Sequence, residues 1–354
     1  MTELSQGRVE LLERARAGDG DAFGQLTEPF RRELQVHCYR MLGSVADAED
    51  VLQETMVAAW RGFAGFEGRA SLRGWLYRIA TNQCLNFMRG SVRRASRPRA
   101  GNPSAMPAQL PPLPEPATAD EPVWLEPYPD ELLAELPDAT PGPEARYEAR
   151  ESISLAFVAA LQQLPARQRA TIVLRDALGF RAAEAAAILG CSLDAVNGSL
   201  KRARAVLAEQ LPADGFSRAP LPGSAAEREF LRRFTDAFER GDVDVLVAML
   251  THDARLTMPP WPLGFRGPAA AARLLSVLVF QGGTLRYRLV EVRANGGQPT
   301  FGCYVAGVPA LAAAPARADG LIMLTLAGDR IAGVTRFLDN SLPPRFGLPE
   351  TMPG

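Results

Sequence analysis

The chain has 354 residues, of which 47% are hydrophobic and 22% charged, and its formal net charge is −1. This length exceeds one ordinary hydrophobic core, so we expect two or three folded domains. The longest apolar run, residues 274–280, is too short to span a membrane, and the charged N-terminus has no apolar signal core. We therefore expect a cytoplasmic protein with no membrane partner.

Cysteine and histidine usage argues against a metal or redox centre. The cysteines, Cys38, Cys84, Cys191 and Cys303, are widely spaced, and the chain has only two histidines. No pair of cysteines has the short spacing of a zinc knuckle or a dithiol motif. We expect no metal site and no cofactor.

Charge is segregated along the chain. Residues 61–99 hold nine arginines and one acid, whereas residues 101–148 hold ten acids, one arginine and 12 of the 29 prolines. Dense proline removes backbone donors and blocks helices, so the acidic tract is predicted to be an extended linker. The near-zero net charge is therefore compatible with a basic folded domain that binds a polyanion.

Two linker-like stretches divide the chain. The predicted organisation is three folded units at 1–95, 146–211 and 225–345, linkers at 96–145 and 212–224, and a tail at 346–354. The first linker also carries Trp124, a tyrosine and several leucines. Apolar residues in such a tract indicate that it docks on another part of the protein.

The first unit is predicted to be almost entirely helical, because its apolar residues recur at intervals of three and four. Two stretches in it, DAEDVLQETMVAAW (47–60) and FEGRASLRGWLYRIATNQCLNFMR (66–89), resemble region 2 of bacterial sigma factors of the extracytoplasmic-function (ECF) group. Periodicity alone would also fit a solvated basic helix in an ordinary bundle, whereas the combined motifs favour the sigma-factor interpretation.

The resemblance implies a role for each stretch. The first helix would bind the β′ clamp of the RNA polymerase core, and the second helix with its preceding loop would open and read the −10 promoter element. The implied polymerase contacts are Asp47, Asp50, Gln53 and Glu54, and the implied −10 contacts are Glu67, Arg69, Arg73, Arg78 and Asn82. Arginines neutralise phosphates, and a loop before a helix can hold an unstacked base. Asn86 departs from the family pattern, because many relatives have aspartate there.

Four helices are predicted between residues 146 and 210, and the last two form a pair. A tight turn at Gly190 precedes an amphipathic helix with a basic end, which is typical of a helix-turn-helix. Ser192 is suited to cap the second helix of the pair. Its apolar stripe is predicted to consist of Leu193, Val196, Leu200, Ala203 and Leu207.

Residues 164–207 resemble sigma region 4, which implies binding to the −35 element and to the polymerase β flap. The implied −35 contacts are Ser192, Asp194, Asn197, Lys201, Arg202 and Arg204. The sequence Asn197-Gly198-Ser199 departs from the basic residues of common relatives. A glycine inside a helix costs roughly 1 kcal/mol relative to alanine. Gly198 either allows a close approach to DNA or is a tolerated surface residue.

After residue 225, helices are followed by strand-like segments, which indicates an α+β fold. Residues 234–267 resemble the SnoaL-like branch of the NTF2-like fold, a cone-shaped domain around a pocket. The candidate pocket residues are Asp253, Met258, Trp261, Phe265, Arg288, Tyr304, Arg336 and Phe337. The resemblance also implies that Trp124, Leu125 and Pro127 of the linker contact this domain, which would act as a built-in regulator.

The predicted fold class is therefore multidomain, with two all-α sigma domains and one α+β NTF2-like cone or barrel. The first functional hypothesis is a sigma factor that binds core RNA polymerase and promoter DNA, with a C-terminal domain that regulates it. The alternative is a small-molecule-binding or isomerase- or cyclase-type enzyme domain fused to a helix-turn-helix regulator. We expect a domain that contacts protein and is not an enzyme, with a small ligand in its pocket as an alternative.

Overall fold

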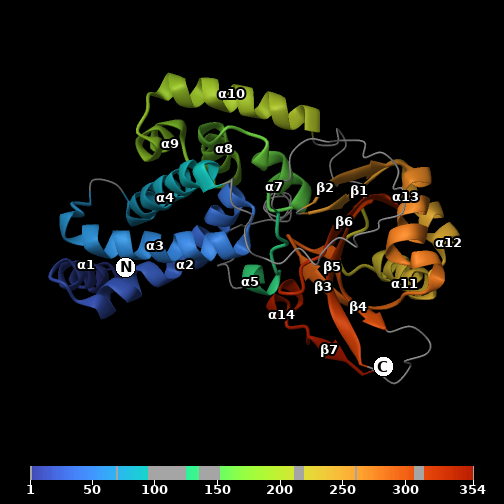
Figure 1. Ribbon diagram of the computed structural model, residues 1–354. Helices are drawn as coiled ribbons and strands as arrows, with labels where there is room; N and C mark the ends of the chain where they lie inside the picture. Colours follow the sequence, from blue (N-terminus) through green and yellow to red (C-terminus); the bar gives the residue numbers. More distant parts are fainter. Residues whose placement is uncertain are drawn as a thin grey trace. The chain divides into compact units, whose positions relative to one another are not determined.

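Figure 1 shows the computed structural model of the chain, which describes residues 2–68, 71–94, 125–134, 152–210, 219–259, 261–306 and 315–353. The chain divides into two compact units. The helical unit consists of Met1–Pro98 and Leu132–Pro212, and the sheet unit consists of Arg99–Glu131 and Ala213–Gly354. Within the described ranges, every helix is too short or too polar to cross a membrane.

The N-terminal part of the helical unit confirms the all-helical prediction. Its elements are α1 (Thr2–Arg16), α2 (Gly20–Leu42), α3 (Val45–Gly62), the 3-10 turn η1 (Phe63–Gly65) and α4 (Leu72–Arg94). Side-chain oxygens of Asp19 and Ser44 cap the starts of α2 and α3. Gly43, with φ of 74°, ends α2 in the left-handed conformation that favours glycine.

The second part of the helical unit contains the predicted helix-turn-helix. Its elements are α7 (Leu155–Gln162), α8 (Ala166–Ile172), the π-helical turn η2 (Val173–Ala177), α9 (Ala182–Leu189) and α10 (Leu193–Gln210). Gly190 ends α9 in the left-handed conformation, and the Ser192 hydroxyl accepts a hydrogen bond from the N–H of Ala195 (3.2 Å). The turn and cap therefore match the sequence prediction.

Two details in this part differ from the expectation. The first predicted helix begins at Leu155, where the Ser154 hydroxyl caps it, and residues 146–151 lie outside the described residues. In α10, four members of the predicted stripe are buried, but Leu193 is 48% exposed. Leu193 lies in the first turn of α10, and the helix packs through its later apolar residues.

The sheet unit holds seven strands and a layer of helices. The strands are β1 (Leu250–Met258), β2 (Trp261–Arg266), β3 (Arg286–Ala294), β4 (Gln298–Ala306), β5 (Ala316–Ala327), β6 (Arg330–Phe337) and β7 (Thr351–Met352). Their order is β2-β1-β6-β5-β4-β3, with β7 paired to β5. The pair β1–β6 is parallel and the other pairs are antiparallel, so the sheet is mixed, as an α+β NTF2-like domain requires.

A group of helices covers one face of the sheet (Figure 1). They are α11 (Ala225–Arg240), α12 (Val243–Ala248) and α13 (Pro268–Leu274), with the turns η3 (Leu275–Val279) and η4 (Gln281–Gly283). The short helix α14 (Leu342–Arg345) lies apart from this group and contacts β5. The short helix α5 (Glu131–Ala134) spans the boundary between the two units. Aromatic rings fill the core between α11 and the sheet, with Phe234 5.4 Å from Phe301 and Phe238 5.6 Å from Tyr287 between ring centroids.

Strand β2 was not expected from the sequence. Prolines in and before it, at Pro259, Pro260 and Pro262, argue against a strand in the middle of a sheet because proline lacks an N–H. The strand order places β2 at an edge, where it pairs with β1 alone. An edge strand tolerates proline because one side of its backbone needs no partner.

Candidate nucleic-acid interface

The surface of α3 carries three of the four predicted polymerase contacts. Asp50, Gln53 and Glu54 are exposed, and Val57 beside them is 48% exposed. Positions separated by three, four and seven residues share one helix face, so these side chains form one surface. Asp47 has the spacing of the same face, but it is buried in the first turn of α3 (4% exposed) and is not part of the exposed surface.

The exposed face of α4 carries two of the predicted −10 contacts. Arg78 and Asn82 are exposed one helical turn apart, and Asn86 and Arg89 continue the same stripe. The Arg89 guanidinium donates to the Asn86 amide oxygen (3.0 Å). Glu67, in the loop before α4, is exposed, whereas Arg69 lies outside the described residues.

Arg73, also predicted to contact DNA, is engaged inside the helical unit. Its Nε donates to the Glu33 carboxylate, with an N–O distance of 3.1 Å. Its guanidinium carbon lies 4.9 Å from the ring centroid of Tyr77 and 4.7 Å from that of Phe180. Tyr77 is fully buried and Phe180 is 6% exposed. Phe180 follows η2, so a residue of the helix-turn-helix part covers this turn of α4.

The buried face of α4 rests on a histidine. His37 of α2 is fully buried, and its Nε2 lies 3.0 Å from the Thr81 hydroxyl. Burial, together with the nearby positive charges of Arg40 and Arg73, lowers the pKa of His37 to about 3. The imidazole is therefore neutral at physiological pH, where it supports α4 through an uncharged hydrogen bond.

Two arginines join α2 to residues 152–169. Arg40 donates to the Ser152 carbonyl (2.9 Å) and hydroxyl (2.7 Å). Arg169 of α8 donates to the Met41 carbonyl (2.5 Å) near the end of α2 and to the Gln162 carbonyl (2.8 Å). Burial lowers the pKa of Arg169 to about 10, so it remains charged at neutral pH. A cation at a helix C-terminus is favoured by the exposed carbonyls there.

The outer face of α10 presents all of the predicted −35 contacts. Ser192, Asp194, Asn197, Lys201, Arg202 and Arg204 are exposed. Arg204 is paired with an acid, because it donates to both carboxylate oxygens of Asp176 (2.7 and 2.8 Å). Gly198 is helical, and a Cβ built on it would lie 3.5 Å from Nη1 of Arg202, an ordinary contact.

Part of the first linker packs on the sheet unit, and we call residues 125–130 the docked segment. Leu125 and Tyr128 are 7% and 0% exposed, and Pro127 is buried. The Tyr128 N–H donates to Oδ1 of Asn295, and the Asn295 N–H donates back to the Tyr128 carbonyl, each at 2.9 Å. Trp124 lies outside the described residues.

The docked segment lies along the edge strand β3. Pro129 forms an antiparallel bridge with Ala294. Asp130 donates its N–H to the Arg293 carbonyl (3.2 Å), and its Oδ1 accepts from the N–H of Gly296 (2.8 Å). Because β3 is the last strand in the sheet order, the segment satisfies backbone groups that the sheet leaves unpaired. The sequence analysis counted Tyr128 among the apolar residues of the linker that indicate docking, but it did not identify its partner Asn295.

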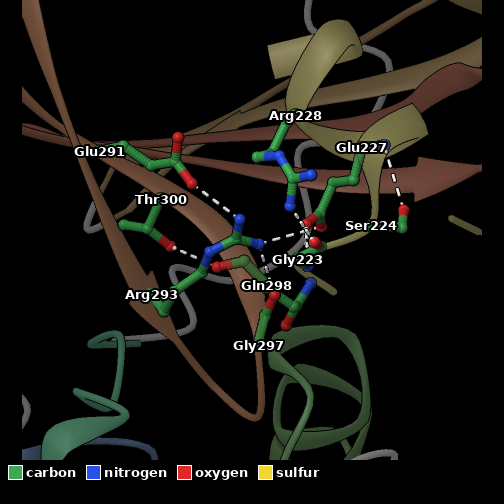
Figure 2. A network of polar contacts seen from close by, with 9 residues as sticks. All are labelled: Gly223, Ser224, Glu227, Arg228, Glu291, Arg293, Gly297, Gln298 and Thr300. Atoms are coloured by element: carbon green, nitrogen blue, oxygen red, sulfur yellow. Dashed lines mark hydrogen bonds and ion pairs between the residues drawn. The ribbon is translucent and has the colours of Figure 1, made fainter. Parts of the chain in front are cut away.

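Side chains behind this turn connect it to the start of α11. Figure 2 shows Arg293 donating to Glu227 (2.9 Å), to Glu291 (2.7 Å) and to the Gly297 carbonyl (3.1 Å). Glu227, which is 1% exposed, also accepts from the N–H of Gly223 (2.6 Å). Pro222 packs beside Gly297. The β3–β4 turn therefore contacts the docked segment and also the chain that enters α11.

The predicted pocket residues are distributed over different environments. Met258 and Phe265 belong to the apolar core, and Phe337 is 2% exposed. Asp253 and Arg288 are exposed, and Arg288 donates to the Pro353 carbonyl (3.0 Å).

The remaining pocket candidates are held by protein groups. Tyr304 donates to the Pro349 carbonyl (2.8 Å). Arg336, which is 7% exposed, pairs with the Asp319 carboxylate (2.5 Å) and donates to the Leu321 carbonyl (3.2 Å). The side chain of Trp261 lies outside the described residues. In the described part of the chain, no cluster of three or more His, Cys, Asp or Glu residues could hold a metal ion.

Comparison with family models divides the chain into three matches. Residues 26–94 match Sigma-70 region 2, residues 154–207 match Sigma-70 region 4, and residues 231–334 match the SnoaL-like domain. The first two matches cover α3, α4 and the helix-turn-helix, and the third covers most of the sheet unit.

Individual relatives agree with the family models. The ECF RNA polymerase sigma factor SigG of Mycobacterium tuberculosis is 42% identical over 340 residues, which are 95% of this chain and 86% of SigG. SigJ of the same species is 28% identical over 314 residues, 87% of this chain and 88% of SigJ. The crystal structure of M. tuberculosis SigJ shares the fold, with a TM-score of 0.56 and 23% identity over 92% of this chain and 99% of that one. The chain therefore belongs to the family of ECF sigma factors, which bind RNA polymerase and direct it to promoters.

Proposed function

We propose that three separate surfaces of this sigma factor bind the polymerase, the −10 element and the −35 element. The exposed face of α3, with Asp50, Gln53 and Glu54, binds the β′ clamp. The exposed stripe of α4, with Arg78 and Asn82, contacts the −10 element. The outer face of α10 binds the −35 element, and its part of the helical unit contacts the β flap. The family match and the exposure of these side chains support the assignment.

The sheet unit regulates these surfaces through the docked segment. The observation that carries this proposal is the pair of 2.9 Å hydrogen bonds between Tyr128 and Asn295. In sequence, the docked segment lies between α4 and α10, so its docking fixes one point of the chain that joins the two DNA-binding helices. Docking therefore controls how far these helices can separate on a promoter.

Run-off transcription with core RNA polymerase tests this regulation. Tyr128→Ala removes a fully buried ring, a loss of about 2 kcal/mol or more, and Asn295→Ala leaves the buried Tyr128 N–H without its acceptor. Both variants should change transcript yield at least about threefold, in the same direction. Tyr128→Phe keeps the ring and both backbone bonds, so it serves as the matched control. Equal yields from all four proteins would exclude regulation through the docked segment.

For the sheet unit itself we propose a protein-contacting role without catalysis. Arg336 and Tyr304 are the polar pocket candidates that lie inside the domain, and both already hydrogen-bond to other groups of the protein. Asp253 is exposed, so Asp253→Ala should fold normally and leave transcription unchanged. Turnover of a small molecule by the parent protein that Asp253→Ala abolishes would favour an enzyme instead.

A further inference from the structure

The last residue of α1 contacts the chain that leads into α4. Nε and Nη2 of Arg16 both donate to the carbonyl oxygen of Phe66, at 3.0 and 2.6 Å. Arg16 lies outside residues 26–94, which match Sigma-70 region 2, whereas Phe66 lies inside them. A side chain from outside the matched region therefore holds the backbone immediately before Glu67, the first of the predicted −10 contacts.

The ring of Phe66 is fixed separately, by the aromatic core of the helical unit. Phe66 is 7% exposed, and its ring centroid lies 5.7 Å from that of Phe63 and 5.1 Å from that of Trp75. Trp75 belongs to the first turn of α4. These contacts fix where the Phe66 side chain lies, but they do not by themselves fix the orientation of the peptide group that follows it.

The contact with Arg16 fixes the orientation of that peptide group. A peptide bond is planar, so the Phe66 carbonyl and the Glu67 N–H point in opposite directions within one rigid plane. An oxygen held by two N–H donors of one guanidinium therefore sets the direction in which the chain enters residue 67. Gly65 and Gly68 flank this peptide, and glycine permits many backbone directions, so an anchor from outside the loop has a large effect here.

The other end of this short loop is attached to α4. The Ser71 hydroxyl accepts a hydrogen bond from the N–H of Gly74 (3.1 Å), and the Ser71 carbonyl accepts from the N–H of Trp75 (3.0 Å), so Ser71 caps the helix. Residues 67–70 separate this cap from the peptide that Arg16 holds. A segment with both ends fixed samples fewer conformations than a segment fixed at one end.

We propose that Arg16 is a positioning residue for −10 recognition, which sets the direction in which Glu67 meets the promoter by holding the Phe66 carbonyl. The proposal rests on the −10 role given above to Glu67 and α4. Arg16 acts through the backbone and needs no contact of its own with DNA. A loop oriented before binding loses less conformational entropy on DNA and adapts less to a wrong base, so loss of Arg16 should weaken the choice between bases.

Run-off transcription with the full chain and core RNA polymerase measures this choice. The quantity is the ratio of transcript from a promoter to transcript from the same promoter with one −10 base pair changed, for each −10 position in turn. Arg16→Ala should lower the largest of these ratios about fivefold, as expected for the loss of one hydrogen-bonded anchor. The same ratio for a changed −35 base pair should stay as in the parent, because α10 is unaltered.

Arg14→Ala is the matched control. It removes an arginine from the same turn of α1, but the partner of Arg14 is the Asp19 carboxylate (2.6 Å). The charge lost near the end of α1 is thus the same, while the hold on the Phe66 carbonyl remains. Both the −10 and the −35 ratios should equal those of the parent.

Arg16→Gln separates a hold on the backbone from a contact with a DNA phosphate. The amide nitrogen of glutamine occupies the same place along the side chain as Nε of arginine, so this variant keeps the donor that lies 3.0 Å from the carbonyl but loses the charge. It should recover at least half of the −10 ratio that Arg16→Ala loses. Recovery by Arg16→Lys without recovery by Arg16→Gln would assign Arg16 to a phosphate and overturn the proposal.

Two further results would overturn it. One is an unchanged −10 ratio in Arg16→Ala. The other is a loss of the −35 ratio or of co-elution with core polymerase in Arg16→Ala, since Arg16 would then stabilise the helical unit as a whole. A parent chain that shows no −10 choice at all would instead contradict the −10 assignment itself, so the two failures are distinguishable.

Discussion

The two helices proposed to read promoter DNA, α4 and α10, differ in what surrounds them. All six predicted contact residues of α10 are exposed, and its buried side is a plain apolar stripe of Val196, Leu200, Ala203 and Leu207. On α4, Arg78 and Asn82 are exposed, but Arg73 is held by Glu33 and covered by Phe180. The predicted contacts of α10 are therefore all exposed, whereas Arg73 of α4 is engaged inside the helical unit.

The difference also extends to the buried sides of the helices. The back of α4 includes a polar pair, His37 and Thr81, and one member can take up a proton. The back of α10 is mostly apolar, with one hydrogen bond between the Thr171 and Ser199 hydroxyls (3.2 Å). The buried side of α4 thus contains an imidazole that titrates, while α10 rests on apolar packing and this hydroxyl contact.

The largest predicted effect is a difference in pH dependence between α4 and α10, caused by His37. The pKa of His37 is about 3 in the folded chain and near 6.5 when unfolded, so the unfolded state binds one more proton between these values. The contribution of neutral His37 to the free energy of unfolding is therefore fully present above pH 6.5. It falls as the pH drops, by about 2 kcal/mol between pH 6.5 and 5. Hydrogen exchange should show α4 amides losing protection over this range while α10 amides do not.

Two variants control this measurement. His37→Gln removes the titrating group and should abolish the pH dependence of α4 protection. His252→Gln changes the other histidine, whose side chain is 95% exposed, and should leave the dependence intact. Protection of α4 that stays constant from pH 7 to pH 5 in the parent chain would contradict the role of His37.

A smaller effect distinguishes two cations on α10. Lys201 is exposed, so Lys201→Ala should lower the salt dependence of duplex binding by about one charge. Arg204 is also exposed but already paired with Asp176, so Arg204→Ala should lower the slope by less than half as much. Affinity titrations against salt concentration measure both. Equal slopes for the two variants would show that the Arg204–Asp176 pair opens on DNA.

The smallest effect concerns Gly198. A Cβ at this position meets only the Arg202 guanidinium at an ordinary distance, so Gly198→Ala should stabilise α10 by about 0.5–1 kcal/mol. Chemical denaturation of the full chain measures the gain. Duplex affinity should be unchanged, and a clear loss of affinity would instead place the backbone of Gly198 against DNA.

Local patterns in the sequence predicted the parts of the fold that depend on local chemistry. Helical periodicity located α3, α4 and α10, and it separated the exposed and buried faces of α10 except at Leu193. Ser192 and Gly190 marked the helix-turn-helix turn through capping and backbone freedom. Strand β2 escaped prediction because its prolines oppose a strand, and only the sheet order explains why an edge position accepts them.

Contacts between distant segments could not be predicted in this way. The burial of Asp47, the edge-to-face contact of Phe180 with Tyr77 and the bonds between Tyr128 and Asn295 each depend on which segments meet in three dimensions. Trp124 and its neighbours indicated that the linker docks, because apolar side chains avoid water. Nothing in the residues around Asn295 indicated that its backbone and amide would receive that linker.

The β3–β4 turn has a consequence for the path of the chain. The chain leaves this turn at Asp130 and returns to it at Pro222, beside Gly297, so everything between belongs to one closed loop that contains region 4. Twelve peptide steps separate Gln210, the last residue of α10, from Pro222, and they reach at most about 40 Å. When α10 binds DNA, Pro222 of the sheet unit must therefore lie within that distance of the end of α10, near the upstream promoter.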